Sequence, residues 1–205
     1  MPNFHDLALR YKQFLESLEK GNEERQQEVA DLIKQLKSHS AIVDVYNKIK
    51  NSNEFKLRVT HHDTKISNVL FDKDNLGACV IDLDTVMPGY FISDVGDMMR
   101  TYLCPVSEEE DDFSKIEIRD EFYFAIVKGY KTFMESELTE TEKEYFFYSG
   151  KFMIYMQALR FLTDYINNDV YYGAKYPKHN LVRAANQVTL LNRLIEKEEK
   201  LCDFA

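Results

Sequence analysis

Glycine, proline and cysteine are all scarce in this sequence. Only seven glycines occur in 205 residues, and Gly21 alone precedes residue 58. A glycine-rich phosphate-binding loop is therefore not expected before that point. The four prolines are scattered, so they indicate turns and not a linker between domains. The three cysteines form no CxxC pair, and such an odd, sparse set indicates a reducing cytoplasm rather than a disulfide framework.

Clustered positive charge and long apolar runs are also missing. A formal net charge of −9 argues against a nucleic-acid-binding protein, which needs clustered lysine and arginine. No segment resembles a signal peptide or is apolar over a length that could span a bilayer. Hydrophobic residues make up 44% of the chain and aromatic residues 13%, as expected of a globular domain. We therefore expect one cytoplasmic domain over residues 1–205 that binds neither nucleic acid nor membrane.

Amphipathic helices account for most of the pattern. Apolar residues at helical spacing predict helices over residues 4–20, 23–37, 41–50, 93–103, 117–135, 140–166 and 180–200. The helix over 140–166 starts with the capping box Thr139-x-x-Glu142. The acidic run at residues 108–112 is expected to form a solvated loop, because like charges repel.

A β-hairpin is expected between the third and fourth helices. Two short apolar runs, residues 69–71 and 78–81, flank a turn at residues 72–77. The fold class is therefore mainly α with a small β-hairpin. Asp63 and Asn68 precede this hairpin, and Asp82 follows it. Because a hairpin returns its two ends to one place, we expect these three side chains to converge at a metal and phosphate site.

The spacing of these residues indicates a specific chemistry. His61-x-Asp63 followed by Asn68 is the H-x-D-x-x-x-x-N arrangement of kinase catalytic loops. There the aspartate accepts the proton of the attacking hydroxyl, and the asparagine holds Mg²⁺. Asp82 matches the second metal aspartate, which bridges the phosphates of ATP through Mg²⁺. The adjacent pair His61 and His62 has no third ligand at a familiar offset, so zinc is not favoured.

Three segments carry a resemblance to a known family. HHDTKISNVLFD, VIDLDTVMPG and SDVGDMMR resemble the aminoglycoside phosphotransferase/choline kinase-like superfamily, and more closely its N-acetylhexosamine 1-kinase-like branch. The likeness runs from Pro2-Asn3-Phe4-His5-Asp6 to the final helix and includes ALRFLTDYINNDVYYGAKYPKHNLVRA. It implies the helical C-terminal lobe of the protein kinase-like fold, with the N-terminal lobe absent. It further implies a helical lead-in (1–57), a catalytic and metal-binding segment (58–100) and a helical subdomain (101–205).

The resemblance also implies residues that bind the substrate. It makes Thr85, Arg160 and Tyr171 contacts to a sugar. Arg160 has apolar neighbours in ALRFLTDY, and a buried unpaired charge is costly, so it must have a partner. An ion pair with Asp164 is the alternative to a ligand contact.

Other polar residues have supporting roles in this interpretation. His61 is a scaffold residue of the catalytic loop, and one of Asp94 and Asp97 braces that loop; alternatively, both are N-cap or first-turn acids of their helix. Asp84 is expected to support the metal site from outside the ligand set. Lys65 either approaches the transferred phosphoryl group or is an ordinary solvated lysine.

The predicted function is that of one lobe of an ATP- and Mg²⁺-dependent kinase acting on a small-molecule hydroxyl, an N-acetylhexosamine-like sugar. Phosphoryl transfer needs positioning and charge neutralisation by both lobes, so the isolated chain is expected to be inactive. Choline, an aminoglycoside or an amino-acid hydroxyl are alternative acceptors, and a non-catalytic sugar- or partner-binding lobe is an alternative class. The face that meets the missing lobe is expected to expose apolar surface and to self-associate.

Overall fold

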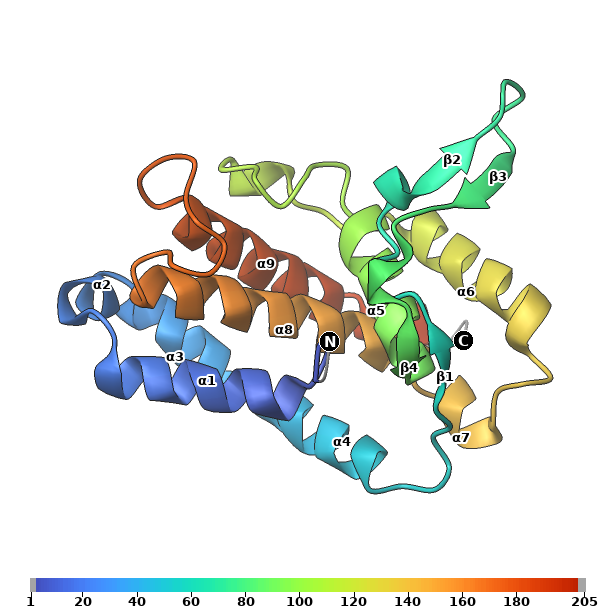
Figure 1. Cartoon of the computed structure of the whole chain (residues 1–205), viewed down its shortest axis with the longest axis horizontal. Helices are drawn as coiled ribbons and strands as arrows, with labels where there is room; N and C mark the ends of the chain where they lie inside the picture. The colour runs from blue at the N-terminus through green and yellow to red at the C-terminus, as the bar shows by residue number, and fades with distance from the viewer. Residues whose placement is uncertain (1–2, 203–205) are drawn as a thin grey trace.

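The computed structural model describes residues 3–202, so Pro2, where the family resemblance begins, lies outside the described residues. The fold is mainly helical, with two small antiparallel sheets of two strands each at one end (Figure 1). The helices are α1 (Leu7–Lys20), α2 (Glu23–Glu28), α3 (Ala30–Ser38), α4 (Ala41–Lys50), α5 (Phe91–Tyr102), α6 (Asp120–Met134), α7 (Glu140–Lys143), α8 (Phe146–Ile166), α9 (His179–Ile195) and α10 (Glu198–Cys202). The strands are β1 (Arg58–Thr60), β2 (Val69–Phe71), β3 (Gly77–Val80) and β4 (Met87–Gly89). Short 3₁₀ turns are η1 (Ile66–Asn68), η2 (Leu83–Thr85) and η3 (Phe113–Lys115). None of the helices within residues 3–202 has the length and apolarity to cross a membrane.

Three predicted helices are each divided in two. The helix expected over 23–37 breaks at Val29, whose φ of −108° and ψ of 20° leave the helical region while its side chain stays buried. The one over 140–166 is split into α7 and α8, although its Thr139 capping box forms as predicted. The last one ends at Ile195 and resumes as α10. In each case the apolar spacing continues across a short break, so the pattern does not reveal it.

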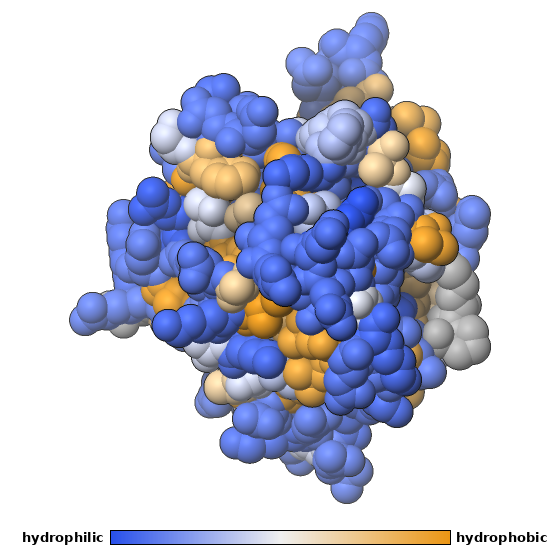
Figure 2. Space-filling model, turned by 90° about the vertical axis from the view of Figure 1, so that its left-hand side faces the viewer, coloured by the Kyte–Doolittle hydropathy of each residue, from blue (hydrophilic) through white to orange (hydrophobic). Residues whose placement is uncertain are grey.

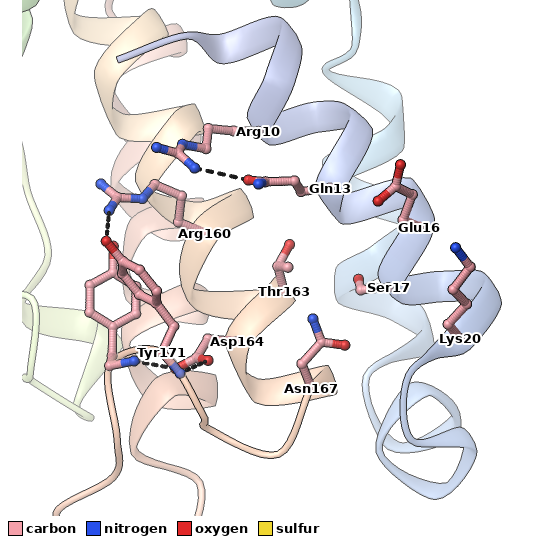
Figure 3. A pocket seen from close by; sticks show the side chains of 11 residues that line it. Arg10, Gln13, Glu16, Ser17, Lys20, Arg160, Thr163, Asp164, Asn167 and Tyr171 are labelled. Carbon is pink, nitrogen blue, oxygen red and sulfur yellow. Dashed lines mark hydrogen bonds between the residues drawn. The ribbon is translucent and has the colours of Figure 1, made fainter. Parts of the chain in front are cut away.

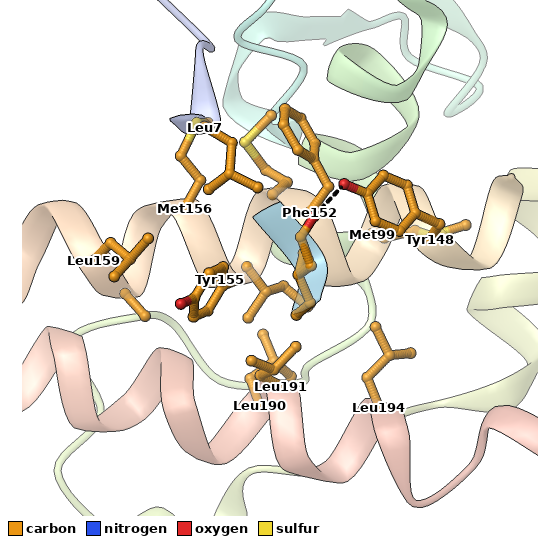
Figure 4. Packing of buried hydrophobic residues seen from close by; sticks show 14 of the residues in the cluster. Leu7, Met99, Tyr148, Phe152, Tyr155, Met156, Leu159, Leu190, Leu191 and Leu194 are labelled. Carbon is orange, nitrogen blue, oxygen red and sulfur yellow. Dashed lines mark hydrogen bonds between the residues drawn. The ribbon is translucent and has the colours of Figure 1, made fainter. Parts of the chain in front are cut away.

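Helix α8 is the centre of the hydrophobic core. Of its 21 residues, only Lys151, Gln157, Arg160 and Thr163 are not buried, as expected of a helix surrounded by others. Helices α1, α4, α5 and α9 pack around it, and leucines of α9 meet its aromatic and methionine side chains (Figures 1 and 4). The few non-buried side chains of α8 therefore mark where the core opens.

Helix α5 packs unusually close to α8 because of Gly96. A Cβ atom at this position would lie 2.3 Å from the backbone oxygen of Ser149. Only glycine therefore allows α5 to lie at this depth against α8. Since α5 also supplies the acids that bind the loop after β1, this close contact positions the candidate site.

The predicted hairpin is present as β2 and β3, with Val69 opposite Val80 and an irregularity after Leu70. It projects away from the helical body (Figure 1). Its apolar side chains are exposed: Leu70 by 48%, Phe71 by 50% and Val80 by 50%. The opposite end of the molecule, near α2, presents mainly hydrophilic residues with small apolar areas between them (Figure 2). The apolar surface that β2 and β3 expose therefore lies on the part of the molecule that projects from the helical body.

The acidic run at residues 108–112 is a loop, and Glu109, Asp111 and Asp112 are exposed in it as predicted. Glu108 differs, because it forms ion pairs with Arg100 on α5 and Arg183 on α9. Burial alone would raise the pKa of Glu108, but these two guanidinium groups hold it below its usual value. Both arginines come from helices distant in sequence or on the far side of the loop, so the local charge pattern could not indicate this pairing.

Candidate active site

The side chains of Asp63 and Asn68 meet on the loop between β1 and β2. Asn68 is 4% exposed, and its Nδ2 donates to both the backbone oxygen and Oδ2 of Asp63, at 2.9 Å each. The ammonium of Lys65 donates to the same Oδ2 at 2.8 Å. This hydrogen bond raises the pKa of Lys65. Lys65 is therefore an ion-paired residue of the site and not a freely solvated lysine.

Asp82 approaches this group from the other end of the hairpin. The backbone N–H of Ile81 donates to the backbone oxygen of Asn68 at 2.9 Å, which joins the two hairpin ends. Asp82 adopts a left-handed conformation with φ of 63° and ψ of 56°, which is uncommon for a residue other than glycine. Its Oδ2 lies 4.0 Å from Nζ of Lys65. The structure therefore places the carboxylates of Asp63 and Asp82 on either side of one ammonium group, and the amide of Asn68 against Asp63.

This donor set fits a hard cation. Asp82 and Asn68 offer oxygen ligands, and Mg²⁺ usually takes only one or two protein carboxylates. The ammonium of Lys65 already lies between Asp63 and Asp82, so the site attracts positive charge. Within residues 3–202, no three His, Cys, Asp or Glu side chains gather in a group that could hold a metal ion. Asp84, which was expected to support this site from outside the ligand set, is exposed on η2.

The two histidines of the loop point to different partners. Nε2 of His61 lies 2.9 Å from the backbone oxygen of Ile81. Nδ1 of His62 lies 2.7 Å from Oγ of Ser93, and its Nε2 lies 2.7 Å from Oγ1 of Thr60. His61 is thus a scaffold contact between the loop and the hairpin exit, and the two rings form no shared metal site.

Helix α5 holds the catalytic loop through two carboxylates. Asp94 accepts hydrogen bonds from the backbone N–H groups of His61 at 2.9 Å and His62 at 2.7 Å. Asp97 accepts one from the N–H of Thr64 at 2.7 Å. Burial raises the pKa of Asp97, and the neighbouring Arg100 opposes that shift. The N-cap of α5 is Tyr90, so neither acid is the N-cap, but Asp94 is a first-turn acid of α5 as well as a brace of the loop.

A cavity of about 530 Å³ connects the catalytic loop with the C-terminal helices. Its lining includes Asp63, Lys65, Thr85, Arg160 and Tyr171. The hydroxyl of Thr85 donates to the backbone oxygen of His61 at 2.6 Å. The three predicted substrate contacts therefore line the same space as the predicted base. The predicted metal ligands Asn68 and Asp82 adjoin this cavity through Asp63 and Lys65.

Helix α9 supplies cavity residues that the sequence analysis missed. Arg183, Asn186, Gln187 and Leu190 line the cavity at helical spacing. Gln187 is 1% exposed, and its Oε1 has no hydrogen-bond partner within the described part of the chain. Polar residues repeated at positions i, i+3 and i+4 on an otherwise core-facing helix are a signal that could have identified this face.

The catalytic loop, the hairpin and α5 all fall within a family match. A family model for a phosphotransferase enzyme family, APH, matches residues 2–123. The chain belongs to this phosphotransferase family. The match includes Asp63, Asn68, Asp82 and Thr85, and it ends before Arg160. Family membership indicates phosphotransferase chemistry. The cavity residues of α8 and α9 lie outside the matched range.

In this phosphotransferase, Arg160 has partners other than the one predicted. Its Nη1 donates to Oε1 of Gln157 at 3.1 Å, and its guanidinium lies 5.8 Å from the ring centroid of Tyr171. Asp164 instead accepts hydrogen bonds from the backbone N–H groups of Tyr171 at 2.7 Å and Tyr172 at 2.9 Å. The alternative of an Arg160–Asp164 ion pair is therefore wrong, since Arg160 is directed to Gln157 and Tyr171 and the carboxylate of Asp164 to the backbone of residues 171 and 172.

Most of the cations that line the cavity of the phosphotransferase are paired with carboxylates. Lys65 lies between Asp63 and Asp82, Arg100 pairs with Asp97 and Glu108, and Arg183 pairs with Glu108. The guanidinium of Arg183 lies 3.7 Å from the ring centroid of Phe161. That of Arg160 lies 5.3 Å from the ring of Tyr172. The aromatic faces of the cavity are therefore already covered by cations.

Proposed function

We propose that this chain is the helical C-terminal lobe of an ATP- and Mg²⁺-dependent kinase that phosphorylates a hydroxyl of an N-acetylhexosamine-like sugar. One observation carries the proposal: the candidate base Asp63 lines the same cavity as Thr85, Arg160 and Tyr171. Family membership supports the phosphotransfer chemistry. The three cysteines form no disulfide within residues 3–202, which supports a cytoplasmic location.

Each residue of the site then has a chemical role. The acceptor oxygen attacks the γ-phosphorus, the bond from that phosphorus to the leaving ADP oxygen breaks, and the acceptor proton passes to the carboxylate of Asp63. Lys65 and Asn68 hold that carboxylate in position through hydrogen bonds of 2.8 and 2.9 Å. Asn68 and Asp82 would hold Mg²⁺, which when bound neutralises charge on the nucleotide phosphates. Asp94 and Asp97 keep the loop in place.

The lining of the cavity supports a sugar over choline. Choline needs free aromatic faces, but Arg160 and Arg183 lie over the rings here. Oε1 of Gln187, with no partner among residues 3–202, suits a hydroxyl or amide donor of a sugar.

The exposed hairpin supports the idea of a second lobe. Leu57, Val59 and Phe71 expose 63%, 81% and 50% of their surface on or beside the two sheets. Such surface on a soluble protein commonly marks an interface. We propose that the lobe covering the nucleotide meets this end and comes from another polypeptide segment, and that the chain without it self-associates there. The division into residues 1–57, 58–100 and 101–205 is part of this proposal.

Direct binding tests the acceptor. Isothermal titration calorimetry of this chain with N-acetylglucosamine, choline and an aminoglycoside should detect binding of the sugar alone. Replacing Arg160 by Met removes charge-assisted hydrogen bonds and should weaken sugar binding by about 10-fold or more. The matched control is Arg193→Met, because Arg193 is half-exposed and pairs with Glu196 away from the cavity. Tighter binding of choline or of the aminoglycoside would contradict the assignment of the acceptor.

Turnover tests the base and the second lobe. This chain alone with Mg²⁺, ATP and sugar should form no ADP above background. In a protein that also carries the nucleotide-covering lobe, Asp63→Asn should abolish transfer and leave sugar binding unchanged. Rapid ADP formation by this chain alone would refute the need for a second lobe. Normal turnover of Asp63→Asn would instead refute the base.

A further inference from the structure

A second cavity lies between α1 and α8, next to the cavity lined by Asp63, Arg160 and Gln187, which is named the acceptor cavity after its proposed role. The second cavity measures about 430 Å³ and shares Arg160, Tyr171 and Tyr172 with the acceptor cavity. Figure 3 shows the side chains of Arg10 on α1 and Arg160 on α8 extending to the same side of the cavity, with Thr163 further along α8 towards Asn167. The phosphotransfer site described above makes no use of Arg10 or Thr163.

Polar atoms inside this cavity lack partners. Nε of Arg10 and Oγ1 of Thr163 are buried, and neither has a hydrogen-bond partner among residues 3–202. The two Nη atoms of Arg10 are occupied: Nη1 donates to Oε1 of Gln13 at 2.9 Å, and Nη2 donates to the backbone oxygen of Phe4 at 3.1 Å. Leaving a buried donor unpaired is costly, so a ligand that supplies an acceptor would relieve this cost. A guanidinium Nε–H can only donate, which fixes the polarity of that ligand.

The charges of the cavity point to an anion. Burial lowers the pKa of Arg10, and the nearby charge of Arg160 lowers it further. Asp164 also lines the cavity, but its two oxygens accept hydrogen bonds from the N–H groups of Tyr171 and Tyr172, and among the described residues it forms no ion pair with either arginine. Glu16 is exposed and lies 3.7 Å from Lys12. Lys20 adds a third positive charge to the lining.

We propose that the α1–α8 cavity is a binding site for a small anion, the carboxylate or phosphoryl group of a metabolite. The anion would accept hydrogen bonds from Nε of Arg10, the hydroxyl of Thr163 and the guanidinium of Arg160. A neutral ligand could pair the unpartnered atoms but would leave the arginines uncompensated, and a cation would add to their repulsion. The site shares Arg160 with the proposed acceptor site, but Arg10 and Thr163 take no part in that site.

Thr163→Val is the sharpest variant for a test. Because the hydroxyl has no partner within the described chain, its removal should leave the thermal midpoint unchanged or higher. The same variant should weaken anion binding by about 10-fold, since it deletes a hydrogen bond to a charged group. The matched control is Thr189→Val on α9, which makes the same chemical change at a hydroxyl bonded to the backbone oxygen of Ala185.

Inorganic phosphate and malonate are titrated separately into the 205-residue protein. Binding is measured by calorimetry and by changes in the amide NMR shifts of α1 and α8. Saturable binding that weakens with rising NaCl concentration, and that Arg10→Met abolishes, supports the site. Tighter binding of phosphate identifies a phosphoryl ligand, and tighter binding of malonate identifies a carboxylate. Absence of saturable binding by both anions overturns the proposal. Equal anion affinity in Thr163→Val and the unaltered protein also overturns it, whatever the outcome for the acceptor.

Discussion

Replacing Glu142 by Gln should destabilise the protein strongly, although the two side chains have nearly the same shape. Glu142 on α7 is fully buried, and its carboxylate accepts four hydrogen bonds. Oε1 bonds the N–H of Lys56 and Nη1 of Arg58, and Oε2 bonds the N–H of Thr139 and Nη2 of Arg58. The Gln amide nitrogen must therefore face two donors in either orientation. It also leaves the charge of Arg58 without its counter-ion.

The cost follows from this geometry. Breaking a buried ion pair by removing one charge typically costs about 3–5 kcal/mol. For a protein of this size that loss should lower the thermal midpoint by roughly 6–20 °C. Arg58 begins the strand that leads into the catalytic loop, so the site should loosen together with the fold.

The effect should depend on pH with a definite sign. Burial alone would raise the pKa of Glu142, but its bonds to Arg58 and to backbone N–H groups hold the pKa below the usual value for glutamate. The stabilisation is therefore fully present above about pH 4.5 and is lost as the pH falls through the lowered folded-state pKa. The difference between Glu142→Gln and the unaltered protein should shrink in the same range.

Urea denaturation at pH 7 and at pH 4 measures the loss of stability in Glu142→Gln and its dependence on pH. The matched control is Glu140→Gln on the same helix, since Glu140 is 91% exposed and should change stability by less than about 0.5 kcal/mol. The double variant Arg58→Met with Glu142→Leu should recover much of the loss, because it leaves no unpaired charge. A loss below 1 kcal/mol in Glu142→Gln would refute the reasoning.

Three further predictions follow from buried groups. Burial lowers the pKa of His5 and of His62, so the unfolded chain binds protons more readily than the folded protein, and the free energy of unfolding should fall as the pH drops below about 6.5. His5→Gln should reduce this dependence on pH, which urea midpoints measured from pH 7.5 to 5 would show. Gln187→Leu should leave the thermal midpoint unchanged or higher but weaken sugar binding about 2- to 10-fold by calorimetry; unaltered affinity would remove Gln187 from the acceptor site. Gly96→Ala should cost about 1–3 kcal/mol in urea denaturation, because the added methyl group would meet the backbone oxygen of Ser149; a neutral effect would show that α5 can move.

The local pattern of the sequence was sufficient for much of the fold. The hairpin of β2 and β3, the capping box at Thr139 and the positions of most helices were predicted from spacing alone. The reason is that turn residues and apolar periodicity act over a few residues, which is also the range over which a strand or helix forms. Helix breaks such as that at Val29 escaped prediction because the apolar spacing continues through them.

The hairpin pattern likewise predicted that the segments carrying Asn68 and Asp82 lie together, since a hairpin brings its own ends together. The cavity beside Asp63 depends on the tertiary structure. Arg160 and Gln187 come from helices that are far from Asp63 in sequence, and they reach its cavity because α8 packs on α5 and α9 packs on α8. Which faces of these helices meet depends on long-range packing, such as the close approach at Gly96, and no local pattern encodes it.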